Sequence, residues 1–413
     1  MPIGKLLSPL TTKREEQSNI LRMLLRGTCY TASITLASVP VLQVFALTYG
    51  IDEARLGVVR LFMQTGSMLG YLLFMKQVNR IPTANLVRKN FLAHLALIVL
   101  PGAMLLLALV APTLSPNVFM LCFTAGYTAS GFLMARHLMI YTRVESRLFA
   151  SPIYGKAFGI AGIVYYLLGM VLGLGVKGAL TLNAGFLLIF SASLLLAFVG
   201  FIASRGFLLV KTDPPPTPEK TVAANTYPRR KIILIVIMHV FRGVMAGIAF
   251  FFVPVALKKF GLLASDAGYV SLLLSAGYLA GYLFIFRKFD GIGPAKTTLL
   301  GAALQILPLL LLVLTPGRAT FFVFYFIFSL GDILIAQGVP LGILQIVPST
   351  SIGSVTALRL VALQAVDALT SLGIGAYTVA HFALFATLYC VLALLVALLA
   401  HMTLAKPPET GSK

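Results

Sequence analysis

The chain has no tryptophan and few charged residues, and it is especially poor in acids. Of its 413 residues, 12 are Asp or Glu and 32 are Lys or Arg, so charged residues make up only 11%. A soluble domain has about 25% charged residues. Since 59% of the residues are hydrophobic and the mean hydropathy is +0.96, a water-soluble fold would have too little polar surface. This composition excludes a soluble enzyme, a disordered chain and a secreted disulfide scaffold.

Residue types that build metal and catalytic sites are also sparse. The three cysteines all lie in apolar runs, and an odd number so placed argues against disulfides and against a metal cluster. The five histidines lie at scattered positions without the spacing of metal ligands. The sequence contains no Gly-rich phosphate loop followed by Lys and Ser or Thr. We therefore expect no metal, no cofactor and no enzymatic activity.

Long apolar runs dominate the rest of the sequence. The run at 91–112 is uncharged and lacks the alternation of a membrane β-barrel strand, and a helix needs about 20 such residues to cross the hydrocarbon. The sequence thus predicts an all-α membrane protein. Only residues 376–380 separate the last two runs, so an eleven-helix arrangement stays open beside twelve. The twelve predicted spans are 27–49, 56–75, 91–112, 117–139, 157–178, 181–204, 232–257, 267–286, 297–315, 320–346, 354–376 and 380–403.

A charged, proline-rich stretch divides these spans six and six. Residues 205–231 contain five prolines among charged residues, a composition typical of a linker. We therefore predict two six-helix bundles, related by a pseudo-two-fold axis and joined by a cytoplasmic linker. The predicted parts are an N-terminal segment 1–26, a first bundle 27–204, the linker 205–231, a second bundle 232–403 and a tail 404–413.

Basic residues are distributed unevenly among the loops. Both termini and the even-numbered loops share one side, and 24 of the 32 Lys and Arg residues lie there, against five on the other side. Because positively charged loops face the cytoplasm, we expect both termini in the cytoplasm and the protein in the plasma membrane, the inner membrane of a bacterium. The net charge of +20 is then an orientation signal rather than evidence for nucleic-acid binding. The expected partners are lipid and a small solute, and we expect a monomer.

Two segments 211 residues apart resemble each other and indicate an internal repeat. The first, GYLLFMKQVNRIPTAN, ends the second span, and the second, GYLFIFRKFDGIGPAK, ends the eighth. They share Gly-Tyr-Leu, three apolar residues, a basic residue, and then Ile and Ala at matching positions. Agreement of this repeat with the six-plus-six arrangement indicates a duplicated bundle.

In this arrangement the chain resembles the major facilitator superfamily of secondary transporters, over about residues 20–403. That family carries an Asp- and Gly-containing basic motif after its second span and a weaker copy after its eighth. Here the first copy has Asn79 and Arg80, and the second has Asp290 followed by Lys296. The resemblance implies a charge lock that steadies one conformation. Asp290 and Lys296 supply both charges in the second copy, whereas Asn79 replaces the acid in the first.

Two acids lie within spans, and both belong to the second half. Asp332 and Asp367 are predicted near the membrane midplane, with Arg242 at a similar depth. An ionisable residue at this depth is costly and usually marks the path of a solute or proton. Burial favours the neutral carboxyl and a nearby cation favours the charged one, so we predict proton coupling at Asp367 or Asp332, modulated by Arg242 or Arg359. The alternative is a structural ion pair that never titrates.

Polar residues in the spans are the candidates for contacts with a solute. Gln364 and Ser371 share a helical face with Asp367, and His239 shares one with Arg242. We expect Arg60 to extend to the membrane interface. The other predicted solute ligands lie in the first half: Tyr165, Tyr166, Gln64, Gln43 and Tyr30.

The resulting hypothesis is secondary active transport of a small organic solute by alternating access, driven by protons. Two alternatives stay open at this stage. One is a membrane scaffold or receptor that keeps the fold but transports nothing, and the other is a passive facilitator of lipid or solute. The direction of transport is equally open.

Overall fold

A computed structural model of the chain describes residues 11, 13–145, 147–148, 153–210, 229–346, 349–375 and 377–404. These residues form helices and contain twelve segments long and apolar enough to cross a membrane. The last two segments are separate helices, so the twelve-span prediction is confirmed. The helices are α2 (Arg14–Leu36), α3 (Val39–Thr48), α4 (Glu53–Asn79), α5 (Thr83–Ala93), α6 (Ala96–Val110), α7 (Pro116–Glu145), α8 (Ile153–Ala179), α9 (Gly185–Ala203), α10 (Arg229–Ala249), α11 (Phe252–Lys259), α12 (Ala267–Ile292), α13 (Pro294–Leu314), α14 (Arg318–Ile346), α15 (Ser349–Ile374) and α16 (Phe382–Leu404), with 3₁₀ turns at Ala111–Thr113 and Ala264–Asp266.

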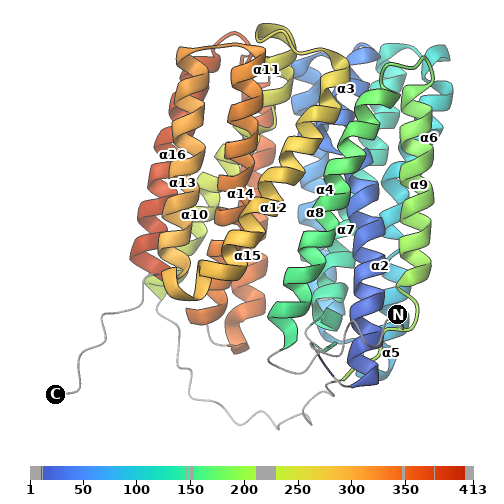
Figure 1. Ribbon diagram of the computed structural model, residues 1–413, viewed down its shortest axis with the longest axis vertical. Helices are drawn as coiled ribbons and strands as arrows, with labels where there is room; N and C mark the ends of the chain where they lie inside the picture. Colours follow the sequence, from blue (N-terminus) through green and yellow to red (C-terminus); the bar gives the residue numbers. More distant parts are fainter. Residues whose placement is uncertain are drawn as a thin grey trace.

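The helices form two six-helix bundles that stand side by side (Figure 1). One hydrophobic core consists entirely of residues from 235 to 404. Two other cores lie mainly in the first half, although Phe250, Phe251 and Ala267 of the second half join one of them. The bundles meet where α4 packs against α15 and where α8 packs against α12. The exact boundaries of the bundles stay predictions, and residues 211–228 of the predicted linker lie outside the described part of the chain.

Leucines point outward from the helices, as expected of a surface that faces lipid. Leu106, Leu121 and Leu314 are 66%, 71% and 78% exposed. A soluble protein rarely exposes large contiguous apolar patches, whereas a bilayer covers such a surface.

The first membrane segment of each bundle is broken at a proline. In the first bundle α2 ends at Leu36, and α3 begins at Val39 directly before Pro40. In the second bundle α10 ends at Ala249, and α11 contains Pro254. Proline has no backbone N–H and leaves the carbonyl four residues earlier without its helical donor. For Pro254 that carbonyl belongs to Phe250, which accepts a hydrogen bond from the Gln43 side chain instead. The matching breaks agree with the internal repeat.

Several polar contacts join the two bundles near the end that carries α3 and α11, which is the upper end in Figure 1. Lys258 forms an ion pair with Glu53 (Nζ–Oε2, 2.7 Å), and Ser38 is hydrogen-bonded to Ser271 (2.7 Å). Lys177 donates to the hydroxyl of Tyr269. The ion pairs that join described residues of different bundles belong to this upper part.

Glycines allow the helices to come close at the same end. A Cβ on Gly173 of α8 would lie 2.6 Å from the backbone nitrogen of Leu272 of α12, and one on Gly57 of α4 would lie 2.5 Å from the carbonyl of Ser371 of α15. Farther down, tyrosine rings separate α8 from α12: Tyr166 stacks on Tyr282 with centroids 5.5 Å apart. In Figure 1, α8 and α12 diverge toward the lower end. The helix backbones of the two bundles therefore come closest near the upper end, whereas tyrosine side chains fill the space between α8 and α12 farther down.

Candidate functional site

A cavity of about 420 Å³ lies between the bundles below the closed upper end. Both helix breaks contribute to its wall, through Ser38 and Pro40 on one side and Phe250 and Phe252 on the other. Interrupted helices in corresponding positions are a feature of transporter binding sites, because they direct free backbone groups and helix ends into the space between repeats. Most of the polar side chains of the wall come from the second bundle: Arg242, Tyr278, Gln305, Tyr325, Ser329, Asp332 and Tyr389.

Arg242 and Asp332 both line this cavity. Asp332 on α14 is partly exposed and accepts one hydrogen bond, from the hydroxyl of Tyr278 to its Oδ2 (2.6 Å). The guanidinium of Arg242 on α10 forms no hydrogen bond or ion pair with any described residue. The side-chain oxygen of Gln305 on α13 is buried and also lacks a partner within the described chain. The cavity thus presents one cation and two acceptors with unused bonding capacity.

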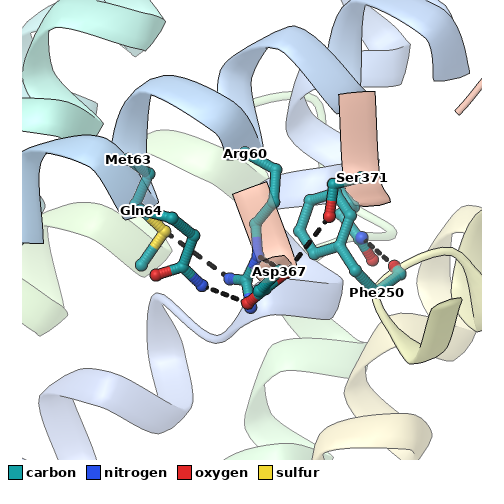
Figure 2. A network of polar contacts seen from close by, with 7 residues as sticks. Arg60, Met63, Gln64, Phe250, Asp367 and Ser371 are labelled. Carbon is teal, nitrogen blue, oxygen red and sulfur yellow. Dashed lines mark hydrogen bonds and ion pairs between the residues drawn. The ribbon is translucent and has the colours of Figure 1, made fainter. Parts of the chain in front are cut away.

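Asp367 does not line the cavity. It is 1% exposed, and three side chains donate to it. Arg60 binds both carboxylate oxygens (Nη2–Oδ2, 2.7 Å; Nε–Oδ1, 3.3 Å), Ser371 donates to Oδ1 (3.1 Å), and Gln64 donates to Oδ2. Figure 2 shows these side chains converging on Asp367 from α4 and α15. The arrangement links the two bundles through a fully engaged carboxylate.

The partner of Asp367 differs from the one considered in the sequence analysis. Arg242 and Arg359 were the candidates, and Arg60 was expected to extend to the membrane interface. Instead Arg60 points inward, with its guanidinium 4.8 Å from the centre of the Phe250 ring. It lines the cavity and binds Asp367 at the same time. The expectation for Arg60 was wrong because a buried acid of the other bundle lies within reach, and that proximity is not visible in the spacing along either helix.

His239 and Arg359 form a separate pair. The Nδ1 atom of His239 lies 2.8 Å from the carbonyl of Ile235, and its Nε2 atom lies 3.1 Å from Nη1 of Arg359. Since the arginine is always a donor, Nε2 accepts and Nδ1 carries the proton. The imidazole is therefore neutral with both nitrogens engaged. His239 is fully buried and is not part of the cavity wall.

The remaining residues that were predicted to bind solute have structural contacts. Tyr165 donates to the carbonyl of Met23 (2.7 Å), and Tyr30 donates to the sulfur of Met134 (3.6 Å). Gln43 is 2% exposed and bonds to the Phe250 carbonyl. Tyr166 faces the second bundle, where it contacts Tyr278 and Tyr282. Gln364 is half-buried, and its side-chain oxygen lacks a partner within the described residues.

The predicted gating loops lie at the lower ends of α4 and α12. Arg80 and Lys296 are exposed there. The side chains of Asn79 and Asp290 lie outside the described part of the structure, so the charge lock implied by the resemblance stays a prediction.

Sequence reasoning missed most of the aromatic and uncharged polar wall of the cavity. Tyr278, Tyr325, Tyr389 and Gln305 lie in apolar spans, and tyrosines in such spans often only pack between helices. The one available signal was the pair of prolines in corresponding spans, which places the cavity wall near Pro40 and Pro254.

Solved transporter structures share this fold. A D-xylose–proton symporter matches with a TM-score of 0.69 at 14% identity, covering 96% of this chain and 99% of that one. The xylose transporter XylE from E. coli, in an inward-open conformation, matches with a TM-score of 0.67 at 13% identity, covering 96% of this chain and 97% of that one. A mutant form of the nucleoside transporter NupG matches with a TM-score of 0.63 at 13% identity, covering 93% of this chain and 98% of that one. No protein-family model and no curated protein matches the sequence. By its twelve helices in two bundles and these structural likenesses, the chain has the fold of the transporters of the major facilitator superfamily.

Proposed function

We propose that the protein is a secondary active transporter that moves a small organic solute by alternating access, with the proton as the coupling ion. The observation that carries this proposal is the cavity between the bundles, in which Arg242 and Asp332 have unused bonding capacity. A guanidinium in a largely apolar cavity costs free energy when its N–H groups lack acceptors, unless a ligand or water supplies them. A scaffold that moves nothing gains nothing from a guanidinium without acceptors. In a solute site, an anionic group of the bound solute supplies the missing acceptors.

The charge distribution of the loops supports an orientation with the lower end in the cytoplasm. Arg80 and Lys296 belong to the strongly basic side of the chain, and basic loops face the cytoplasm. In this orientation the ion pair of Glu53 with Lys258 closes the external side. The structure then corresponds to a conformation that is closed on the external side.

Asp332 is the better of the two acids for carrying a proton. It accepts a hydrogen bond from one side chain, whereas three side chains donate to Asp367. The other titratable groups that line the cavity with Asp332 are Arg60 on α4, Arg242 on α10, Tyr278 on α12, Tyr325 on α14 and Tyr389 on α16. Because the cavity opens to alternate sides, Asp332 can take up a proton from one side and release it to the other.

The cluster around Asp367 has a different role in this proposal. It joins α4 to α15 near the closed end through an ion pair with little access to solvent. This cluster must separate when the bundles open on the external side. We therefore assign Arg60 and Asp367 to the external gate, and Arg359 with His239 to support of the second bundle.

Uptake of solutes into proteoliposomes tests the proposal. A panel of sugars, nucleosides, amino acids, organic anions and organic cations is offered with and without an imposed pH gradient, and internal pH is followed with a dye. We expect at least one solute to move with the gradient. In Asp332→Asn we expect gradient-driven accumulation to be lost.

The matched control is Asp52→Asn, an exposed acid that caps α4 and at which Asn caps about as well. This control should accumulate solute like the unmodified protein. Gradient-driven accumulation that survives in Asp332→Asn would contradict the proposed proton site. Equal movement with and without a gradient in the unmodified protein would indicate the passive facilitator, and no movement of any solute would indicate the scaffold.

A further inference from the structure

We propose that the solute is a small zwitterion with an aromatic or apolar body, whose anionic group binds Arg242 and whose ammonium group binds Asp332 and Gln305. This inference rests on the proposed function, because it assigns a substrate class to the same cavity. It goes beyond that function because it states which charges the solute carries and which residue of the chain binds each charge.

The first step concerns the unused hydrogen-bond donors of Arg242. Its guanidinium lies in the cavity and forms no hydrogen bond or ion pair with any described residue. Although Asp332 lines the same space, no ion pair within 4 Å joins the two described side chains. A planar guanidinium with five N–H donors binds a carboxylate through two parallel hydrogen bonds. The chemistry at this wall therefore selects an anion.

The second step concerns two hydrogen-bond acceptors that also line the cavity, Asp332 and Gln305. Oδ2 of Asp332 accepts from Tyr278, while Oδ1 accepts nothing from the described residues. The Gln305 side-chain oxygen is buried without a partner among those residues, and Gln305 is only 1% exposed. An ammonium group has three donors and no acceptor, so it can satisfy both oxygens at once. The chemistry of these acceptors selects a cation.

A zwitterion is the one class that satisfies both Arg242 and the acceptors. A neutral sugar offers no charge to Arg242 or Asp332, and a singly charged solute pairs with only one of them. A zwitterion pairs both charges and adds no net charge to the cavity.

The other residues of the cavity wall determine what kind of uncharged body the solute can have. Phe252, Phe328, Tyr325 and Tyr389 surround the polar groups, and Tyr389 and Phe328 have ring centroids 5.5 Å apart. Aromatic walls favour an aromatic or apolar body. The cavity volume of about 420 Å³ lies near the lower end of the range of about 300–1,000 Å³ typical of small-molecule sites. An amino acid or dipeptide has the matching size.

Binding to the purified full-length protein in lipid nanodiscs, measured by calorimetry at neutral pH, tests the inference. The zwitterionic probes are L-phenylalanine, with closely spaced charges, and L-phenylalanyl-L-alanine, with wider spacing. Phenethylamine carries only the cation, 3-phenylpropionate carries only the anion, and D-xylose carries neither. We expect at least one zwitterion to bind tenfold or more tightly than all three other probes. This comparison uses the unmodified protein and so does not depend on the folding of a variant.

Two variants then locate each charge. Arg242→Gln should weaken the zwitterion and 3-phenylpropionate at least tenfold and leave phenethylamine unchanged. Asp332→Asn should weaken the zwitterion and phenethylamine and leave 3-phenylpropionate unchanged. Arg55→Gln and Asp52→Asn change exposed residues at the start of α4 and should leave every affinity unchanged. Tighter binding of D-xylose or of a singly charged probe than of either zwitterion would overturn the inference.

The outcome also separates this inference from the transport proposal. If neither zwitterion binds but another solute accumulates in proteoliposomes, the substrate class is wrong and the transporter stands. If a zwitterion binds as expected but no solute crosses the membrane, the site is confirmed and transport is contradicted.

Discussion

A single arginine from one bundle and a single aspartate from the other make the most enclosed ion pair between the bundles. The Asp367 side chain is 1% exposed and the Arg60 side chain 14% exposed, so water screens their attraction little. Removing one partner of such a pair leaves the other charge uncompensated, whereas removing both does not. The pair is therefore expected to influence the conformational equilibrium more than its two hydrogen bonds alone would suggest.

We predict that Arg60→Gln opens the upper end. Loss of a buried partner costs about 3–5 kcal/mol, and about 1.4 kcal/mol already changes an equilibrium tenfold. The measurement is labelling of Ser38→Cys by a membrane-impermeant maleimide in right-side-out vesicles, in a Cys122→Ser background, because Cys29 and Cys390 are buried. Labelling should accelerate at least tenfold. The labelling rate of the double variant Arg60→Gln/Asp367→Asn should lie closer to that of the protein without these two changes. Slower labelling in Arg60→Gln would contradict the assignment of Arg60 to the external gate.

His239 offers a prediction that separates structure from proton transfer. Its neutral ring accepts a hydrogen bond from Arg359 through Nε2, and a glutamine oxygen can replace that acceptor. We expect His239→Gln to keep the pH profile of transport, and His239→Leu to destabilise the protein by about 1–3 kcal/mol because Arg359 loses its acceptor. Thermal unfolding and transport at several pH values measure both effects. A shifted pH profile in His239→Gln would instead make this imidazole a proton carrier.

The residues of the site were predictable from the sequence only in part. A charge within an apolar span stands out, and this is how Asp332, Asp367 and Arg242 were recognised. Their partners were not predictable, because Arg60 and Asp367 lie 307 residues apart in the chain and on different bundles. Tyr278 and Gln305 carry no formal charge, so nothing in an apolar span distinguishes them from residues that only pack.

At the scale of the helix, the break between α10 and α11 shows most directly how one residue of the sequence, Pro254, shapes the cavity wall. Pro254 leaves the Phe250 carbonyl without a helical donor, and the Gln43 amide of the other bundle takes its place. Phe250 and Phe252 flank the break and line the cavity. The break therefore determines both a contact between bundles and the shape of the cavity wall.

We predict that Pro254→Ala impairs transport without reducing thermal stability. Alanine restores an N–H that competes with Gln43 for the Phe250 carbonyl, and it favours one continuous helix in place of α10 and α11. Transport of the identified solute should fall at least tenfold. Pro101→Ala is the matched control, because Pro101 lies inside α6 and is not part of the cavity wall. Equal activity of Pro254→Ala and Pro101→Ala would contradict a role for the break.

At the scale of the whole molecule, the twelve spans and the two bundles followed from the sequence because hydrophobic length and loop charge are properties of single segments. Which end of the bundles is closed did not follow. The closure depends on complementary surfaces, such as Gly173 of α8 against Leu272 of α12. The span 157–178 contains several glycines, a composition typical of close helix packing, but the sequence does not say which helix packs there or at which height.

We predict that Gly173→Val forces the upper end apart. The new side chain meets the backbone of Leu272, which cannot rotate away as a side chain can. Labelling of Ser38→Cys from the outside should rise at least tenfold, and the conformation open to the outside should dominate. Gly175→Val lies two residues farther along the same helix, where a Cβ meets nothing within 4 Å, and should label like its parent. Equal labelling of the two variants would mean that α8 and α12 do not form the closure.

Lys258, which pairs with Glu53, lies at the end of α11, and α11 contacts α3 of the other bundle. The exposed ends of these two helices, Thr48 of α3 and Lys258 and Lys259 of α11, form a composite epitope that exists only while the upper end is shut. An antibody fragment that recognises both helices at once would hold the bundles in this state without reaching the cavity. Such a binder would inhibit noncompetitively, and its affinity would report which conformation the protein occupies in the membrane.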